Sequence, residues 1–213
     1  MEESMKHEWK KHEKALYGVG KTPSFVSVPA QNFVMISGQG NPNDADFSNR
    51  VGVLFSLAYA IKMNYKTVMA EREESGGIDD YAVYPLEGVW KLKRDGKLIK
   101  EELEYTIMIR QPDFITEEMV KEAVERVKAK KREPLLDEVR FSSMQDGNCI
   151  EILHTGTYDS EPDSFEKMNR FAEENGLVRM ENRHREIYLS NAKRVEPDKL
   201  RTILRYRVRS AAL

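Results

Sequence analysis

The spacing of hydrophobic residues along the chain predicts three helices. One face of a helix is predicted by hydrophobic residues at positions i, i+3, i+4, i+7 and i+10, namely Val51, Leu54, Phe55, Ala58 and Ile61. This helix is capped at Asp46 or Ser48 and ends near residue 65. Two further helices with the same kind of pattern are predicted over residues 117–131 and 162–176.

Shorter hydrophobic runs between these helices predict strands. They cover residues 31–37, 80–92, 102–112, 184–191 and 199–208, with two more strands inside 139–159. Pro85 predicts an irregularity or an edge position within 80–92. Asp-Gly pairs predict two tight turns, one within 94–97 and one at Asp146-Gly147 between the two strands of 139–159.

The order of these elements repeats along the chain. In each half, a strand that ends in Gly, Asn and Asp residues leads to one helix and then to a two-strand hairpin. This order predicts an α+β fold of duplicated β-α-β-β modules, with antiparallel sheets and helices on one face. Residues 1–25 would form an N-terminal arm, and residues 26–213 one domain with halves of about 26–130 and 131–213. Two unrelated units would give the same pattern.

Composition and charge exclude several classes of protein. The 213 residues are 40% hydrophobic and 33% charged, which is typical of a globular chain. A formal net charge of −2 offers no basic surface, so neither nucleic acid nor a membrane is an expected partner. Residues 1–16 lack the apolar core of a secretory signal, and the single Cys149 suits a reducing compartment. We therefore expect a cytoplasmic protein.

One predicted strand carries a carboxylate in an unexpected place. Side chains alternate along a strand, so Arg185 and Ile187 share one face, while Glu186 shares the other with His184 and Tyr188. If Ile187 packs on the helices, Glu186 and Tyr188 point into a groove on the opposite face or at the seam between the halves. Burying such a carboxylate costs free energy unless it is paired.

Two interpretations of Glu186 follow from this position. In the first, Glu186 pairs across strands with Arg205 or Arg207 and has a purely structural role. In the second, the carboxylate attracts a cation or orients a water molecule, with Tyr188 beside it.

Aromatic and methionine side chains are the candidate lining of such a groove. Large aromatic residues most often fill a core, but an aromatic wall with one carboxylate would suit flat, hydrophobic or cationic molecules. The candidate ligand-binding residues are Trp90, Tyr65, Tyr84, Tyr158, Met63, Met108 and Phe171.

The sequence predicts neither a metal site nor a cofactor. The four histidines show no metal-ligand spacing with Cys149. GQGNPN at 38–43 lacks the Lys-Ser/Thr of a phosphate loop and the further glycine of a dinucleotide fingerprint. No G-x-S-x-G motif is present.

Several motifs together resemble the GyrI-like small-molecule-binding domains. The segments are HTGTYDSEPDSF at 154–165, HREIYLSN at 184–191 and KLRTILRYRV at 199–208. In the first half, GNPND at 40–44, YAIKM at 59–63, YPLEGVW at 84–90 and IMIRQPDF at 107–114 look like a longer stand-alone branch. The resemblance implies two modules related by a pseudo-twofold axis, with Glu186 in the groove between them.

The branch resembled includes hydrolases that open the cyclopropane of DNA-alkylating natural products with an aromatic cage. The resemblance makes Trp90 the main cage residue and implies that Tyr65, Tyr158 and Tyr188 stack on the ligand while Glu186 orients water. Two departures from the family pattern are Lys91, where a second aromatic often follows, and Arg185, where a histidine often precedes the glutamate.

Other members of the family imply other functions. One alternative is a protein that only binds or sequesters drugs in the same groove, and another is an inhibitor that binds gyrase as a protein partner. A regulator of transcription is a weaker interpretation, because residues 1–25 are too short for a helix-turn-helix domain. The sequence identifies neither the natural ligand nor a protein partner.

Overall fold

A computed structural model describes residues 5–71, 77–91, 100–130 and 132–211. The helices are α1 (Trp9–His12), α2 (Lys14–Tyr17), α3 (Ala45–Ala70), α4 (Glu117–Lys130) and α5 (Glu161–Glu174). The strands are β1 (Met5–His7), β2 (Ser24–Gln39), β3 (Ile78–Tyr81), β4 (Leu86–Lys91), β5 (Glu104–Gln111), β6 (Arg140–Thr155), β7 (Leu177–Arg179), β8 (Arg183–Tyr188) and β9 (Arg201–Ser210). Short 3-10 helices are η1 (Lys100–Glu102), η2 (Pro134–Glu138), η3 (Tyr158–Ser160) and η4 (Pro197–Lys199).

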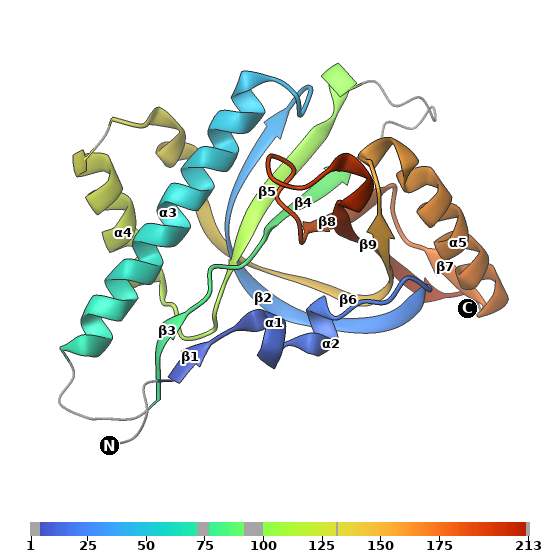
Figure 1. The fold of residues 1–213 in the computed structure, drawn as a ribbon, viewed down its shortest axis with the longest axis horizontal. Helices are drawn as coiled ribbons and strands as arrows, with labels where there is room; N and C mark the ends of the chain where they lie inside the picture. The colour runs from blue at the N-terminus through green and yellow to red at the C-terminus, as the bar shows by residue number, and fades with distance from the viewer. Residues whose placement is uncertain (1–4, 72–76, 92–99, 131, 212–213) are drawn as a thin grey trace.

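Six antiparallel strands pair in a closed cycle, β2-β5-β4-β8-β9-β6 (Figure 1). The cycle closes because β6 pairs with β2 on one edge and with β9 on the other. β7 extends the sheet beyond β9, and β1 and β3 form a separate parallel pair. The α+β class with an antiparallel sheet is therefore confirmed, and the sheet has an inner and an outer face.

The predicted turn at Asp146-Gly147 is wrong. β6 is one strand of 16 residues, and its register with β2 is the same on both sides of Gly147. Gly147 has a φ of +66°, which only glycine adopts readily, so the strand bends there without reversing. The predicted strand over 80–92 is divided into β3 and β4 before Pro85, and the predicted turn at 94–97 lies outside the described residues.

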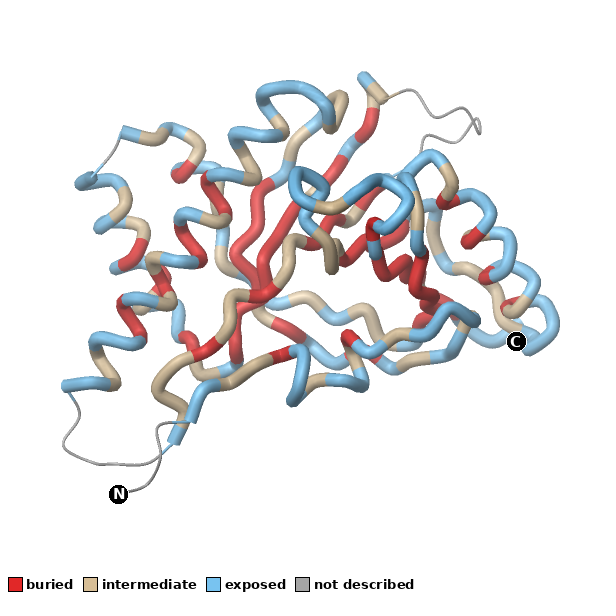
Figure 2. The backbone as a smooth tube through the Cα atoms, viewed as in Figure 1, coloured by how far each residue is buried: buried red, intermediate tan, exposed pale blue. Residues whose placement is uncertain are grey.

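The helices pack on the outer face of the sheet, in two groups. α3 covers β2 and β5, where Ile36, Ile107 and Ile109 are fully buried, and α4 packs beside α3. α5 covers a different part of the same face, where Met168 packs on a hydrophobic cluster that includes Leu204. Buried residues are concentrated in the strands and on the helix faces that pack against them (Figure 2).

The predicted orientation of the β8 side chains is reversed. Glu186 pairs in register with Gly88 of β4 and with Leu204 of β9, so Glu186 shares the outer face with the helices. Arg185 and Ile187 point to the inner face. Glu186 and the helices are thus on the same side of the sheet, so a ligand groove at Glu186 would lie between α3 and α5.

The inner face is filled by ion pairs as well as by hydrophobic residues. Arg185 donates to Glu87 at 2.7 Å, and Arg205 donates to Glu151 at 2.6 Å. Arg207 pairs with Glu181 at 3.2 Å. The structural interpretation of Glu186, as the partner of Arg205 or Arg207, is therefore wrong, because both arginines have other carboxylate partners.

Residues 5–17 of the N-terminal segment pack against the sheet. Trp9 and Tyr17 are buried, and the Trp9 indole donates to the carbonyl of Val83 at 3.1 Å. The Glu13 carboxylate accepts hydrogen bonds from Arg110 and Tyr84. The division into an arm and two halves stays a prediction. Among the described residues, no helix has both the length and the apolar character needed to cross a membrane.

We predict that Arg205→Met lowers the free energy of unfolding by about 3–5 kcal/mol, because it leaves the Glu151 carboxylate buried without its cation. Urea denaturation measures the change. Arg201→Met, at an exposed position of β9, is the matched control. The double variant Arg205→Met, Glu151→Gln should recover most of the loss. A single variant as stable as the wild type would show that the pair contributes little.

Candidate functional site

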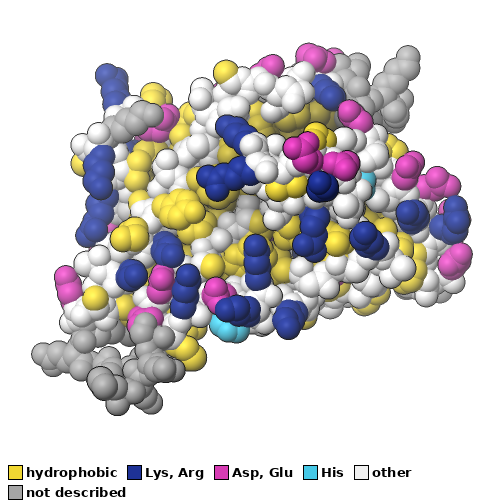
Figure 3. Space-filling model, in the orientation of Figure 1, with side chains coloured by type: hydrophobic (Ala, Val, Ile, Leu, Met, Phe, Trp, Pro, Cys, Tyr) yellow, Lys and Arg dark blue, Asp and Glu magenta, His cyan; other side chains and the backbone are white. Residues whose placement is uncertain are grey.

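The site lies on the outer face, where β4 pairs with β8. Gly88 is opposite Glu186, and Trp90 is opposite His184. With this register, the side chains of His184, Glu186 and Tyr188 lie between the start of α3 and the start of α5. Figure 3 shows hydrophobic side chains at the bottom of a hollow over β5 and β4.

Glu186 is the centre of a chain of hydrogen bonds. The Tyr188 hydroxyl donates to Glu186 Oε2 at 2.7 Å, and the Trp90 indole donates to the Tyr188 oxygen at 2.9 Å. His184 Nε2 is hydrogen-bonded to Glu186 Oε1 at 2.8 Å. Glu186 is 8% exposed. Its carboxylate is thus held in one orientation by two hydrogen bonds.

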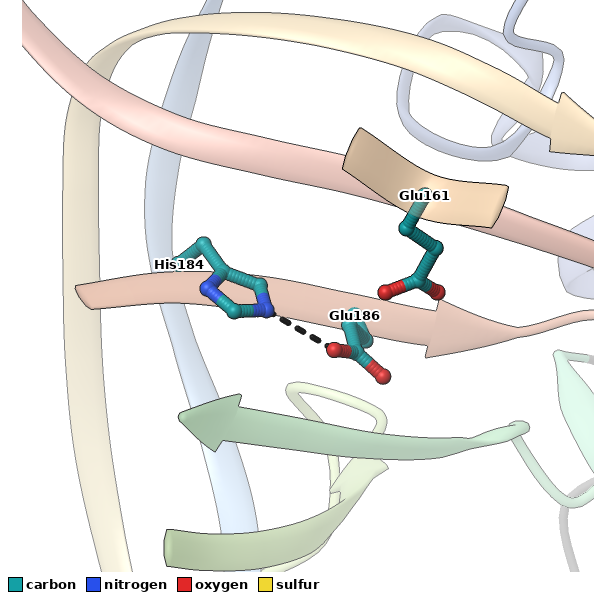
Figure 4. A group of neighbouring side chains, drawn as sticks. All are labelled: Glu161, His184 and Glu186. Atoms are coloured by element: carbon teal, nitrogen blue, oxygen red, sulfur yellow. Dashed lines mark hydrogen bonds and ion pairs between the residues drawn. The ribbon is translucent and has the colours of Figure 1, made fainter. Parts of the chain in front are cut away.

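A second carboxylate, Glu161, points at this group from the first residue of α5 (Figure 4). Glu161 is buried, and its Oε1 has no hydrogen-bond partner among the residues that the structure describes. Burial, followed by the charge of Glu186, raises the pKa of the Glu161 carboxyl well above its usual range. Glu161 therefore holds a proton at neutral pH while Glu186 accepts hydrogen bonds.

The segment before α5 fixes the position of Glu161. His154 lies 2.9 Å from Ser164 Oγ through Nδ1 and 2.9 Å from the Thr157 carbonyl through Nε2. These contacts bind β6 to both η3 and α5. Gly156 makes the turn with a φ of +135°, which a residue with a side chain adopts only under strain.

Three aromatic rings form one wall beside the carboxylates. Phe47 from the first turn of α3 stacks on Trp90 at 5.8 Å between centroids, and Tyr105 of β5 lies 5.3 Å from Trp90. A Cβ at Gly88 would lie 2.7 Å from the indole nitrogen of Trp90. Gly88 therefore provides the space that lets Trp90 reach Tyr188.

Tyr158 stands at the opening of the site. Its ring is perpendicular to that of Tyr188 at 6.0 Å, and the residue is 44% exposed. Partial burial and the charges of Glu186 and Glu161 raise the pKa of the Tyr158 hydroxyl. The pKa of Tyr188 is raised well above 10 by burial and by Glu186, so both phenols stay protonated at neutral pH.

Comparison with known proteins identifies the family. A family model described as the GyrI-like small molecule binding domain matches residues 21–209. The chain belongs to this family. Two crystal structures of hydrolases from Listeria innocua are each 32% identical to it. One has a TM-score of 0.85 and covers 96% of this chain and 100% of its own; the other has a TM-score of 0.82 and covers 95% and 100%.

A more distant structure shares the GyrI-like fold alone. The C-terminal domain of EcmrR is 13% identical, with a TM-score of 0.52, and the match covers 89% of this chain and 98% of that domain. A search of curated proteins gave no match.

The structure brings four of the predicted residues together, namely Glu186, Tyr188, Trp90 and Tyr158. Tyr84 and Met108 lie elsewhere. Tyr84 hydrogen-bonds to Glu13 of the N-terminal segment. Met108 is fully buried on the inner face with Phe33.

The other three predicted lining residues are also placed away from Glu186. Tyr65 is buried and donates to the Ile78 carbonyl at 2.5 Å, so it joins α3 to β3. Met63 is 57% exposed on the outer side of α3, and Phe171 packs in the core beneath α5. We therefore leave these residues out of the proposed site.

Sequence reasoning missed Glu161, Phe47 and Tyr105 and gave His184 no role. Glu161 reads as an ordinary acidic residue of a first helical turn, which favours helix formation by itself. Phe47 precedes the periodic part of α3, and Tyr105 alternates with core residues of β5. Only the pairing of β4 with β8 shows that these residues meet.

Glu161, His184 and Glu186 raise the question of a metal ion. One donor atom from each residue lies within 4.8 Å of the others, and such donors are common metal ligands. His184 Nε2, however, is already bonded to Glu186 and would have to release it. We therefore interpret the cluster as a hydrogen-bonded group of side chains.

We predict that Glu161→Gln stabilises the GyrI-like protein. The titratable groups around Glu161 are His184, Glu186 and Tyr188 on β8 and Tyr158 and Asp159 on η3. Because the folded protein binds a proton that the unfolded chain lacks, stability falls as pH rises from about 4.5 to about 9. Glutamine removes this cost and should raise stability at pH 7 by about 1.4 kcal/mol or more, equal to one pKa unit or more.

Thermal melting between pH 4 and 9 measures this effect. The difference in Tm between Glu161→Gln and the wild type should grow with pH, at about 2–4 °C for each kcal/mol. Glu166→Gln, at an exposed position of α5, is the control. A constant or negative difference would contradict the raised pKa of Glu161.

We predict that Gly88→Ala weakens ligand binding by about tenfold or more, the equivalent of about 1.4 kcal/mol. The new methyl group would push Trp90 away from Tyr188. Gly52→Ala is the control, because a Cβ there meets nothing within 4 Å. Quenching of tryptophan fluorescence by a flat aromatic cation measures affinity. Equal affinity of both variants would mean that Trp90 is not held by this contact.

Proposed function

We propose that this protein binds flat hydrophobic or cationic xenobiotics in the groove between α3 and α5 and hydrolyses cyclopropane-bearing DNA-alkylating compounds. The observation that carries the proposal is the Glu186 carboxylate, held by His184 and Tyr188 beside the Trp90 ring. The hydrolase description of two relatives at 32% identity favours an enzyme of this reaction class. Such an enzyme would protect the cell from alkylation.

The proposed reaction uses the aromatic wall to position the substrate. Trp90 and Phe47 offer ring faces on one side, and Tyr158 lies near the opening. A flat compound stacked there would present its strained carbon to the carboxylates. Aromatic stacking of this kind contributes about 0.5–1.5 kcal/mol per pair beyond the burial of area.

Glu186 acts as the general base in this proposal. It takes a proton from a water molecule whose oxygen forms a bond to the cyclopropane carbon. The carbon–carbon bond of the ring breaks, and its electron pair moves to a conjugated carbonyl, whose oxygen takes a proton from solvent to become a hydroxyl. Glu186 then returns its own proton to solvent. The product is the substrate plus one water. A positioned base usually contributes about 10²–10⁴ in rate, and the strain of the ring supplies driving force.

A second candidate function is ligand binding without catalysis, which is favoured by two carboxyl groups that lack a lysine or arginine partner among the described residues. In the part of the chain that the structure describes, neither Glu161 nor Glu186 pairs with a lysine or arginine. A cationic aromatic ligand would supply the missing positive charge and displace the proton of Glu161. Affinity for such a cation would then rise with pH.

We predict that Glu186→Gln lowers the rate of turnover by about 100-fold or more, which is the lower end of the usual contribution of a general base. Mass spectrometry of a cyclopropane-bearing indole alkylator, incubated with purified protein, measures the gain of one water. Glu151→Gln is unsuitable as a control because its carboxylate is buried in an ion pair, so Glu166→Gln is used. Unreduced turnover in Glu186→Gln would remove Glu186 from the mechanism. An unchanged alkylator that stays bound to the wild type would favour the binding function.

A further inference from the structure

Two carboxylates of the site face each other from different elements. One oxygen of Glu161 and one of Glu186 lie within 4.8 Å of each other, together with His184 Nε2. Figure 4 shows Glu161 descending from the start of α5 toward Glu186 on β8. Hydrolysis of a cyclopropane by the proposed mechanism uses Glu186 and leaves Glu161 without a function.

The environments of the two carboxylates differ in a way that separates their roles. Glu186 is hydrogen-bonded to His184 at 2.8 Å and accepts a hydrogen bond from Tyr188 at 2.7 Å. Glu161 has a buried oxygen with no partner, and it lies against the negative charge of Glu186. A carboxyl that keeps its proton, next to a second carboxyl held by other hydrogen bonds, is an arrangement that can supply an acid and a base.

We propose that the groove also hydrolyses epoxides carried on flat aromatic compounds, with Glu186 as the base and Glu161 as the acid. The proposal extends the proposed function, since it uses the same groove and the same base. It adds a substrate class and assigns a role to Glu161.

The distance between the two carboxylates favours this substrate class. In an epoxide, the leaving oxygen is bonded directly to the carbon that water attacks, so the acid and the base act on opposite sides of one carbon, with the water and the epoxide between them. Each carboxyl needs to be within about 2.6–3.2 Å of its own proton partner. In a cyclopropane conjugated to a carbonyl, the oxygen that gains the proton lies several bonds away from the attacked carbon. A neighbouring pair such as Glu161 and Glu186 therefore fits the epoxide better.

The proposed step balances without any further reagent. Glu186 takes one proton from water, and the water oxygen forms a bond to an epoxide carbon. The carbon–oxygen bond of the ring breaks, its electron pair goes to the ring oxygen, and Glu161 donates its proton to that oxygen. The product is a diol. Glu186 then carries a proton and Glu161 a negative charge, and transfer of this proton from Glu186 to Glu161 restores the starting state.

The hydrophobic surroundings help the acid to act. The Phe165 ring packs edge-on against His184 at 4.8 Å between centroids, and the Tyr188 ring lies on the other side of Glu186. These rings limit access of bulk water to the pair, so the proton of Glu161 is available to a bound oxygen. Among the described residues, the buried Oε1 of Glu161 has no hydrogen-bond partner that a bound epoxide would have to displace.

The test measures epoxide and cyclopropane hydrolysis side by side. Wild-type protein, treated with a chelator, is incubated in ¹⁸O-labelled water with a flat aryl epoxide, and the diol is measured by mass spectrometry. We expect one ¹⁸O in the diol and a loss of about 100-fold or more in both Glu161→Gln and Glu186→Gln. Glu166→Gln should keep the full rate, and melting curves show that each variant folds.

The pH profile separates an acid from a structural residue. The rate with the epoxide should fall as pH rises through about 9 in the wild type, because Glu161 loses its proton there. Cyclopropane hydrolysis should depend far less on Glu161 than epoxide hydrolysis does. An equal loss of both reactions in Glu161→Gln would mean that Glu161 only shapes the site, and would overturn its role as an acid.

The remaining outcomes distinguish this proposal from the proposed function. Turnover of the cyclopropane without any diol from the epoxide would overturn the epoxide activity alone. Absence of both reactions would overturn both proposals. Diol formation that survives in Glu161→Gln would keep the activity and remove Glu161 from it.

Discussion

The pairing of β4 with β8 is the constraint on which the site depends. It joins strands that lie about 95 residues apart in the sequence and sets Gly88 opposite Glu186 and Trp90 opposite His184. A shift of one residue would turn Glu186 to the inner face, among the ion pairs of Arg185 and Glu87. The register therefore decides whether Glu186 meets a ligand or fills the interior.

The burial of two carboxylates at this site lowers the stability of the folded protein. Glu161 and Glu186 are buried together, and in the described part of the chain no arginine or lysine compensates them. By contrast, the inner face places its carboxylates against arginines, as Glu151 lies against Arg205. A buried group without a fixed partner lowers stability, and such groups are characteristic of sites that bind or react.

Much of the fold could be predicted from the sequence, because helical spacing and strand alternation are local properties. The three helices at α3, α4 and α5 and the antiparallel α+β class were predicted in this way. Asp146-Gly147 was misinterpreted as a turn, because only the neighbouring β2 shows that the strand continues. The face of Glu186 was reversed for a similar reason. Alternation tells which residues share a face, while tertiary packing decides what covers it.

The candidate site could be predicted only in part. Glu186, Tyr188 and Trp90 stand on strands with clear motifs, and they meet as expected. Tyr65 and Met108 have the same residue types and hydrophobic neighbours, so sequence alone did not separate core from groove. The proximity of Glu161 to Glu186 could not be predicted from the sequence, because it arises from the packing of α5 on β8.

Infrared spectroscopy of the protein with ¹³C-labelled glutamate carboxyls tests most directly whether Glu161 holds a proton beside Glu186 at neutral pH. The account predicts a protonated carboxyl band at neutral pH that disappears as pH rises through about 9 and is absent in Glu161→Gln. A spectrum without this band at neutral pH, or a band that persists in Glu161→Gln, would contradict the account.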